Sequence, residues 1–395
     1  MPGPLDRIVV LDLTRALAGP YCTLMLADMG ADVIKIEAPG GGDETRRWGP
    51  PFQAGESSYF MSVNRNKRSL TLDLKAPRGQ EVLRRLVQRS DVLVENFRPG
   101  TMARLGMTYE QAAALRPDLV YCSVSGFGQT GPRSQQPAYD QILQGMGGVM
   151  SLTGAPDGVP TKVGIPIADI CAGMFAAYAI ALALFHRERG GGGQYVDTSM
   201  LGGQAALLTF QAARLFANGT PPGRGGNRHP TIAPYESFQA ADGWVNVACG
   251  NEGMWQRFCE ALGLRALRSD PRFATNADRV RHREELSTAI QAEISRHSVA
   301  DVVRTLGAAE VPVGPVFRLD ELFADPQAEH LELRREIEHP RVGRLAQTGF
   351  PYRLSRTPPE LRLPPPLLGQ HTDEILAELG YEASEARALR DDGIV

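Results

Sequence analysis

The chain has 395 residues, a length that predicts two domains rather than one. Hydrophobic residues make up 43% of the chain and charged residues 22%, which is typical of a globular protein with a buried core. The formal net charge is −3, so the chain has no excess of positive charge that would bind a nucleic acid or an anionic membrane. We therefore expect neither as a partner.

The cysteines indicate the compartment. The five of them are scattered along the chain and form neither a CxxC pair nor a Cys/His cluster, so neither a disulfide framework nor a metal site is expected. The first seven residues lack the charged and apolar regions of a signal peptide. We therefore expect a protein of the reducing cytoplasm.

Two strands and a helix are predicted near the N-terminus. Residues 8–13 and 32–37 are short apolar runs typical of buried strands. Helix signals run between them from Gly19 to Met29, and Gly30 is a typical C-terminal stop. A strand, a helix and a strand within about 30 residues form a βαβ unit, which implies parallel strands.

A dinucleotide site is one function that such a unit can have. Glu37 ends the second strand, where an acid that binds the ribose of NAD would stand. The turn at residues 14–20 has a single glycine and lacks the GxGxxG pattern, however. The sequence therefore disfavours an NAD-dependent oxidoreductase and keeps the α/β fold class.

The strand pattern continues along the chain. Further strands are predicted at residues 69–74, 91–95, 119–125 and 194–199. Helical patterns separate the first three, as expected for an α/β protein with a parallel sheet.

Basic and amide side chains follow these strands. Ligands of open α/β sheets bind at the carboxyl ends of the strands. A single Lys or Arg is usually a solvated surface charge, but several at one edge suit a phosphate-bearing ligand. The segment 64–68 adds a basic cluster. The other side chains are Arg15, Lys75, Asn96, Arg98 and Arg104.

An apolar stretch at residues 165–185 holds one carboxylate, Asp169. It is long enough to span a membrane, but Pro166, Asp169 and the many small residues favour a core helix. Asp169 lies where a loop enters this helix, so one interpretation is a helix N-cap. The other is a carboxylate nucleophile in surroundings that exclude water.

A second, smaller unit is predicted after residue 220. Residues 221–230 are rich in Pro, Gly, Arg and Asn, which is typical of a domain junction. Residues 235–239 and 244–249 have the pattern of a β-hairpin. Helical patterns then run to about Leu306, and residues 311–316 close the unit.

Several motifs occur in a fixed order over most of the chain. With them the chain resembles the class III CoA-transferases, a family that also includes carnitine CoA-transferases, formyl-CoA:oxalate transferases and α-methylacyl-CoA racemases. The motifs are residues 11–14 with 18–20, 30–37, 66–69, 94–100, 126–132 and 226–230.

The resemblance implies an α/β fold with a Rossmann-like large domain, a smaller inserted α+β domain and an interlocked homodimer. Together with the composition shift, it predicts the first part of the large domain at residues 1–222. The small domain follows at 223–330, and a return segment at 331–395 completes the large domain.

The resemblance also implies the site residues. Asp169 corresponds to the family's nucleophilic aspartate. Gly250, Asn251 and Glu252 correspond to a small-domain loop that covers the site and whose backbone N–H groups are candidate oxyanion donors. A CoA thioester is then a substrate, with no tightly bound cofactor. The predicted CoA contacts are Leu17, Ala18, Leu72, Lys75, Asn96, Phe97, Arg98, Arg104 and Tyr139.

The predicted activity is transfer of CoA from an acyl-CoA thioester to a small carboxylic acid through a covalent intermediate on Asp169. Succinyl-CoA or another small dicarboxyl-CoA is the hypothesis for the donor. A run of glycines followed by Gln marks the oxalate enzymes of the family, and residues 250–253 depart from it.

The sequence leaves two alternative functions open. An α-methylacyl-CoA racemase needs two opposed acid/base groups, but Tyr139 stands where the racemases carry His and is a poor base near neutral pH. A CoA-binding protein without catalysis is disfavoured by the intact Asp169.

Overall fold

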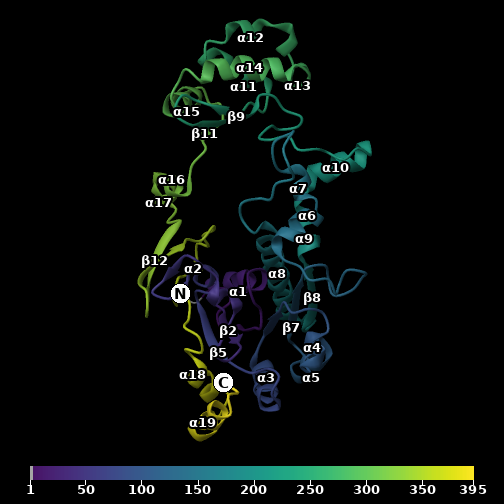
Figure 1. Cartoon of the computed structure of the whole chain (residues 1–395), viewed down its shortest axis with the longest axis vertical. Helices are drawn as coiled ribbons and strands as arrows, with labels where there is room; N and C mark the ends of the chain where they lie inside the picture. The colour runs from purple at the N-terminus through teal and green to yellow at the C-terminus, as the bar shows by residue number, and fades with distance from the viewer. Residues whose placement is uncertain (1–2) are drawn as a thin grey trace. The chain divides into compact units, whose positions relative to one another are not determined.

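The computed structural model describes residues 3–395, and these divide into two compact units (Figure 1). The larger unit comprises Met1–Met150, Lys162–Thr220 and Glu329–Val395, and the second comprises Ser151–Thr161 and Pro221–Ala328. The short segment Ser151–Thr161 thus belongs to the second unit, although no composition shift separates it from its neighbours in the sequence.

A six-stranded sheet forms the centre of the larger unit. Its strand order is β5-β2-β1-β6-β7-β8, and every neighbouring pair is parallel. This confirms the predicted α/β class with a parallel sheet. The strands are β1 (Val9–Asp12), β2 (Asp32–Glu37), β5 (Lys67–Thr71), β6 (Val92–Glu95), β7 (Val120–Ser125) and β8 (Gln194–Ser199).

Both faces of this sheet are covered, so its inner strands β1, β6 and β7 are buried on both sides. Val10 packs with helices α1 (Ala18–Asp28) and α8 (Ile167–His186), which lie side by side (Figure 1). Leu11 points to the opposite face, as alternate residues of a strand do. There it packs with α3 (Pro77–Arg89), α5 (Tyr109–Leu115), α18 (Thr372–Glu378) and α19 (Ala383–Asp391).

Helix α8 is the apolar stretch that contains Asp169. Ala168, Ala172, Ala176 and Ile180 are buried against the sheet. A Cβ at Gly173 would lie 2.6 Å from the Ala18 carbonyl oxygen, so a glycine is required for the close approach of α1 and α8. Within residues 3–395, α8 and its continuation form one helix that is apolar and long enough to cross a membrane, and half of its most apolar window is buried.

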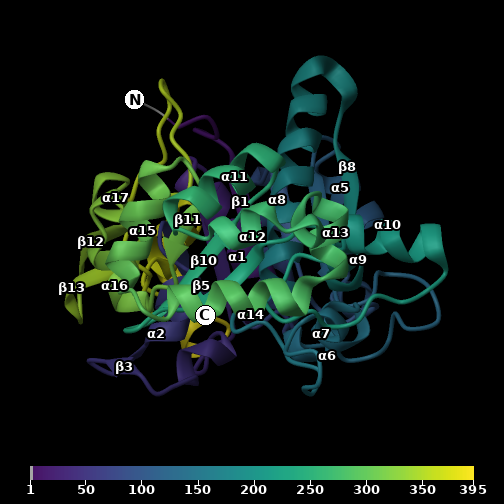
Figure 2. The same cartoon turned by 90° about the horizontal axis from the view of Figure 1, so that it is seen from above.

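The second unit has a three-stranded antiparallel sheet with the order β11-β10-β9. Strands β9 (Tyr235–Gln239) and β10 (Trp244–Ala248) form the predicted hairpin, and β11 (Val313–Pro315) joins its edge. Helices α14 (Arg283–Ile294) and α15 (Val299–Ala308) pack on this sheet (Figure 2).

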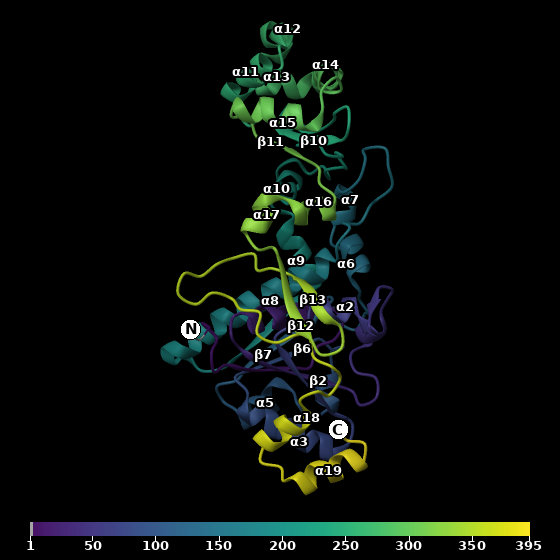
Figure 3. The same cartoon turned by 90° about the vertical axis from the view of Figure 1, so that its left-hand side faces the viewer.

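The last segment completes the larger unit. Strands β12 (Arg334–His339) and β13 (Gly343–Thr348) pair as a hairpin, and an extended stretch leads from them to α18 and α19 (Figure 3). The Asn66 side chain holds this stretch, because it donates to Glu360 O at 2.8 Å and accepts from Leu363 N at 2.9 Å.

The basic cluster at residues 64–68 is not a ligand site. Arg65, Lys67 and Arg68 are buried, and each pairs with a carboxylate of the larger unit. The interpretation as a phosphate-binding edge is therefore wrong for this segment. Strand β5 accordingly begins at Lys67, two residues earlier than predicted, because paired charges are compatible with a buried strand.

Candidate active site

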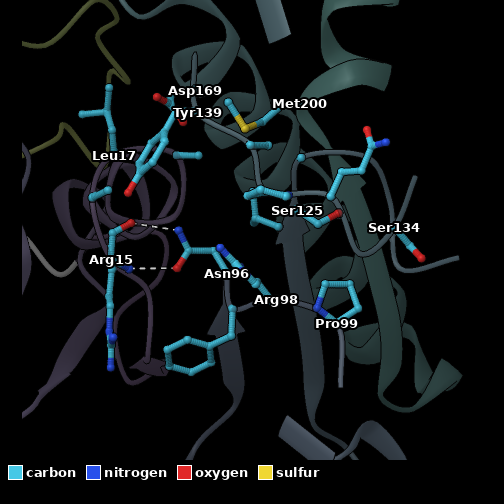
Figure 4. A pocket seen from close by; sticks show the side chains of 18 of the residues that line it. Arg15, Leu17, Asn96, Arg98, Pro99, Ser125, Ser134, Tyr139, Asp169 and Met200 are labelled. Atoms are coloured by element: carbon cyan, nitrogen blue, oxygen red, sulfur yellow. Dashed lines mark hydrogen bonds between the residues drawn. The ribbon is translucent and has the colours of Figure 1, made fainter. Parts of the chain in front are cut away.

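A cavity of about 310 Å³ lies at the carboxyl ends of β1, β6 and β7, where ligands of α/β sheets bind (Figure 4). The loop after β1 contributes Arg15 to Ala18, and the loop after β6 contributes Asn96 to Pro99. Tyr139, Asp169 and Met200 complete the wall above them in Figure 4. Thus six of the predicted CoA contacts share one cavity with the predicted nucleophile: Leu17, Ala18, Asn96, Phe97, Arg98 and Tyr139.

Asp169 lies in the first turn of α8, and no side-chain donor of residues 3–395 hydrogen-bonds to its carboxylate. The N-cap of α8 is Pro166, so the interpretation of Asp169 as a helix N-cap is wrong. Burial raises the pKa of Asp169 to about 7, and the neighbouring Asp140 carboxylate adds to the shift. A carboxylate with so little solvation is a better base and nucleophile than one in water.

The carboxylate of Asp140 caps the N-terminus of α8. Asp140 is the first residue of α6 (Asp140–Met146). Its Oδ1 accepts hydrogen bonds from Ala168 N at 2.8 Å and Asp169 N at 3.5 Å, and its Oδ2 accepts from Gln144 Nε2 at 2.7 Å. Two N–H groups of the α8 N-terminus are thereby satisfied, and the first turn that carries Asp169 is held. This contact was not predictable, because nothing in the sequence relates residues 140 and 168.

The loop after β1 rests on buried charges. Lys35 Nζ donates to Thr14 O at 2.9 Å and forms an ion pair with Asp43 at 3.0 Å. Asp43 Oδ1 in turn accepts from Ala16 N at 3.3 Å. Burial alone would lower the pKa of Lys35, but the carboxylates around it raise that pKa instead, Asp43 most strongly. The ammonium is therefore charged and fixes the loop that lines the cavity.

A second cavity, of about 450 Å³, contains two more predicted contacts, Leu72 and Lys75. Arg15 and Phe97 line both cavities. Arg104 lines neither, and its Nη2 donates to Thr101 Oγ1 at 2.9 Å. Its contact with CoA stays a prediction.

The three residues of the predicted lid loop belong to the second unit. Asn251 is the N-cap of α11 (Glu252–Ala261), where its side chain accepts from Met254 N at 2.9 Å. Glu252 forms an ion pair with the buried Arg279 at 2.7 Å, and Gly250 is exposed. Their function at the site stays a prediction.

Any reaction that uses the Asp169 carboxylate should lose rate as the pH falls below about 7, because protonation removes the lone pair that reacts. Asp140→Asn removes a neighbouring negative charge and should move this limb to lower pH. The pH profile of kcat/KM measures the shift. A limb that stays at the same pH in the variant would exclude an electrostatic effect of Asp140.

Comparisons with known proteins identify the family of the chain. A family model described as CoA-transferase family III matches residues 5–372. A succinate–glutarate CoA-transferase of Agrobacterium fabrum is 44% identical over 382 residues, which cover 95% of this chain and 96% of that protein. An acetyl-CoA:oxalate CoA-transferase of Acetobacter aceti is 44% identical and covers 82% of this chain and 84% of its own length. The crystal structure of a CAIB/BAIF family protein from Brucella suis has a TM-score of 0.86 and 40% identity, covering 96% of this chain and all of that one.

Proposed function

The chain belongs to CoA-transferase family III and transfers CoA between an acyl-CoA thioester and a carboxylic acid, and from this premise we propose that Asp169 carries the transfer. The observation behind the proposal is the unpaired, poorly solvated carboxylate at the wall of the 310 Å³ cavity. The relatives named as CoA-transferases favour this activity over a racemase, a dinucleotide enzyme or a non-catalytic binding protein.

The proposed chemistry consists of four balanced exchanges. The Asp169 carboxylate attacks the thioester carbon, and the C–S bond breaks to give a mixed anhydride and CoA thiolate. The thiolate then attacks the aspartyl carbonyl, which releases the donor acid and leaves an aspartyl-CoA thioester. The acceptor carboxylate attacks this thioester and gives a second anhydride and thiolate. Attack of the thiolate on the acceptor's carbonyl forms the new acyl-CoA and frees Asp169.

Each exchange passes through a tetrahedral oxyanion that needs N–H donors. We propose the backbone N–H groups of Gly250, Asn251 and Glu252 as these donors. Gly250 is exposed and has no Cβ that would prevent a substrate oxygen from approaching its N–H group. The side chain of Glu252 forms an ion pair with Arg279. Gly250→Pro removes one of these N–H groups, and an unchanged kcat in this variant would exclude that donor.

Succinyl-CoA and a small dicarboxylic acid are the proposed substrates, as the name of the Agrobacterium relative suggests. Mass spectrometry of the products formed from succinyl-CoA with glutarate or oxalate tests this. We expect glutaryl-CoA to form with a kcat/KM at least ~10-fold above that of oxalyl-CoA, a ratio within the reach of pocket contacts. Faster transfer to oxalate, the acid in the name of the Acetobacter relative, would contradict the proposed acceptor.

A homodimer is proposed for the assembly, interlocked as the resemblance implies. Helix α8 exposes Met174, Phe175, Tyr178, Leu182 and Phe185 along one face, and an apolar groove of about 690 Å³ lies against this face. A contiguous apolar surface of this kind is typical of an interface. Light scattering should give twice the chain mass of 42.9 kDa, and a monomer mass would exclude the dimer.

The two compact units are proposed as the domains of the enzyme, and the cytoplasm as its compartment. All five cysteines are buried as free thiols, which suits a reducing environment. Fractionation of the host cell tests the compartment, and recovery of the protein with membranes would exclude it.

A further inference from the structure

The loop after β1 is held by a reciprocal pair of hydrogen bonds. Asn96 Oδ1 accepts from Arg15 N at 2.8 Å, and Asn96 Nδ2 donates to Arg15 O at 2.8 Å (Figure 4). The side-chain amide thus binds one backbone residue in the way that a neighbouring strand would. Arg15 cannot shift without breaking both bonds.

Ala16, the residue after Arg15, has an unusual backbone conformation. Ala16 has a φ of 63°, a left-handed conformation that is unfavourable for a residue with a Cβ. The turn directs neighbouring side chains to different places. Leu17 lies beside the cavity of Asp169, whereas the Arg15 side chain points away from Asp169 (Figure 4).

The guanidinium of Arg15 lies over the Phe97 ring, 5.1 Å from its centroid. No carboxylate of residues 3–395 forms an ion pair with it, whereas Arg46, which lies near the same edge, is engaged by Glu37 at 2.7 Å. Arg15 and Phe97 are also the two residues that line both the Asp169 cavity and the cavity of Lys75. An unpaired cation therefore stands where the two cavities meet.

The chemistry of the substrate indicates a function for this cation. The thioester of an acyl-CoA must reach Asp169 in the first cavity, and a diphosphate and a 3′-phosphate lie toward its nucleotide end. A planar guanidinium stacked on an aromatic ring offers paired donors that match phosphate oxygens. We propose that Arg15 binds a phosphate group of CoA and that Asn96 acts as the positioning residue that presents it.

The inference rests on the proposed function of the Asp169 cavity and adds how the same site holds its CoA substrate. In this inference the Asn96 side chain positions Arg15 and does not contact CoA directly. Both polar groups of that amide are already used by the Arg15 backbone. A carboxylate of the acceptor acid is a less suitable partner for Arg15, because the guanidinium points away from Asp169.

Calorimetry with CoA, dephospho-CoA and pantetheine tests the inference. Arg15→Gln should weaken CoA binding about 10- to 100-fold, the usual effect of losing a charge-assisted pair, and should leave pantetheine binding unchanged. A loss that disappears with dephospho-CoA identifies the 3′-phosphate, and one that persists identifies the diphosphate. An unchanged Kd for CoA, or an equal loss for pantetheine, would overturn the proposal.

The positioning role has its own test. Asn96→Asp keeps an acceptor for Arg15 N but places a carboxylate oxygen against Arg15 O. Its loss of CoA affinity should not add to that of Arg15→Gln, because both act through one contact. Fully additive losses would show that Asn96 binds CoA independently. Arg15→Lys keeps the charge without the planar fork and should lose less affinity than Arg15→Gln.

A matched control is Arg89→Gln, which removes an exposed charge from the last turn of α3 and should leave every Kd unchanged. The Kd values measured for these variants do not depend on covalent chemistry at Asp169. A wild-type enzyme that binds CoA but never forms an adduct would contradict the proposed function alone. An Arg15→Gln variant with wild-type affinity would contradict this inference alone.

Discussion

Asp169→Asn should abolish CoA transfer, with a fall in kcat of about 10⁴-fold or more, because no other group replaces a lost covalent nucleophile. The amide has nearly the same shape, so CoA binding should persist. Asp169→Glu should also fail, since one more methylene displaces the reacting oxygen. Steady-state assays with an acyl-CoA donor measure both effects, and Asp118→Asn at an exposed surface position provides the control.

The same variant should be more stable than the wild type. The pKa of Asp169 is about 7 in the fold and has an ordinary value of 3.8, so the unfolded chain releases this proton first. Wild-type stability therefore falls as the pH rises from about 4 to 7, and the cost remains at higher pH. We expect Asp169→Asn to gain about 1–2 kcal/mol at pH 8 in urea unfolding. A less stable variant would show that the carboxylate supports the fold.

The second large effect is expected at Asp12, which should cost about 3–5 kcal/mol of stability when replaced by asparagine. Its Oδ2 lies 3.1 Å from Lys67 Nζ, and it accepts hydrogen bonds from Thr14 and Thr23 in a site without solvent. Burial would raise the pKa of Asp12, but Lys67 and Lys35 outweigh it and hold this pKa well below its usual range. The neutral side chain would leave the buried Lys67 ammonium without its counter-charge, whereas Lys35 would keep its ion pair with Asp43.

A double-mutant cycle with Lys67→Met tests this interpretation. Removal of both members of the pair should cost less than the sum of the two single losses, because no isolated charge remains. Urea unfolding of the three variants gives the coupling energy. Additive losses, or a loss below 1 kcal/mol for Asp12→Asn, would contradict a paired buried network.

The predictable part of the fold was local. Residues 8–13 and 32–37 each contain a short run of mostly apolar residues, which is typical of a buried parallel strand, and both are strands of the central sheet. Asp169 was recognisable because a single carboxylate in an apolar stretch is unusual, and its place in the cavity follows from the order of strands and helices.

The missed features depend on partners distant in sequence. Lys67 is chemically the same as a surface lysine until the fold brings Asp12 beside it. The side chains of Asp140 and Asn96 likewise form hydrogen bonds with backbone groups that are 28 and 81 residues away in the sequence. Sequence patterns report burial and periodicity, whereas the pairing of a charge or an amide is decided by tertiary structure.

Intact-protein mass spectrometry after incubation with succinyl-CoA and hydroxylamine tests the central claim most directly. Hydroxylamine attacks an aspartyl anhydride or thioester and leaves a hydroxamate on the side chain, which peptide mapping can locate. We predict a modification that depends on the acyl-CoA, maps to Asp169 and is absent from Asp169→Asn. An unmodified protein that still binds CoA and transfers it, or a hydroxamate on another residue such as Glu44, would contradict Asp169 as the nucleophile.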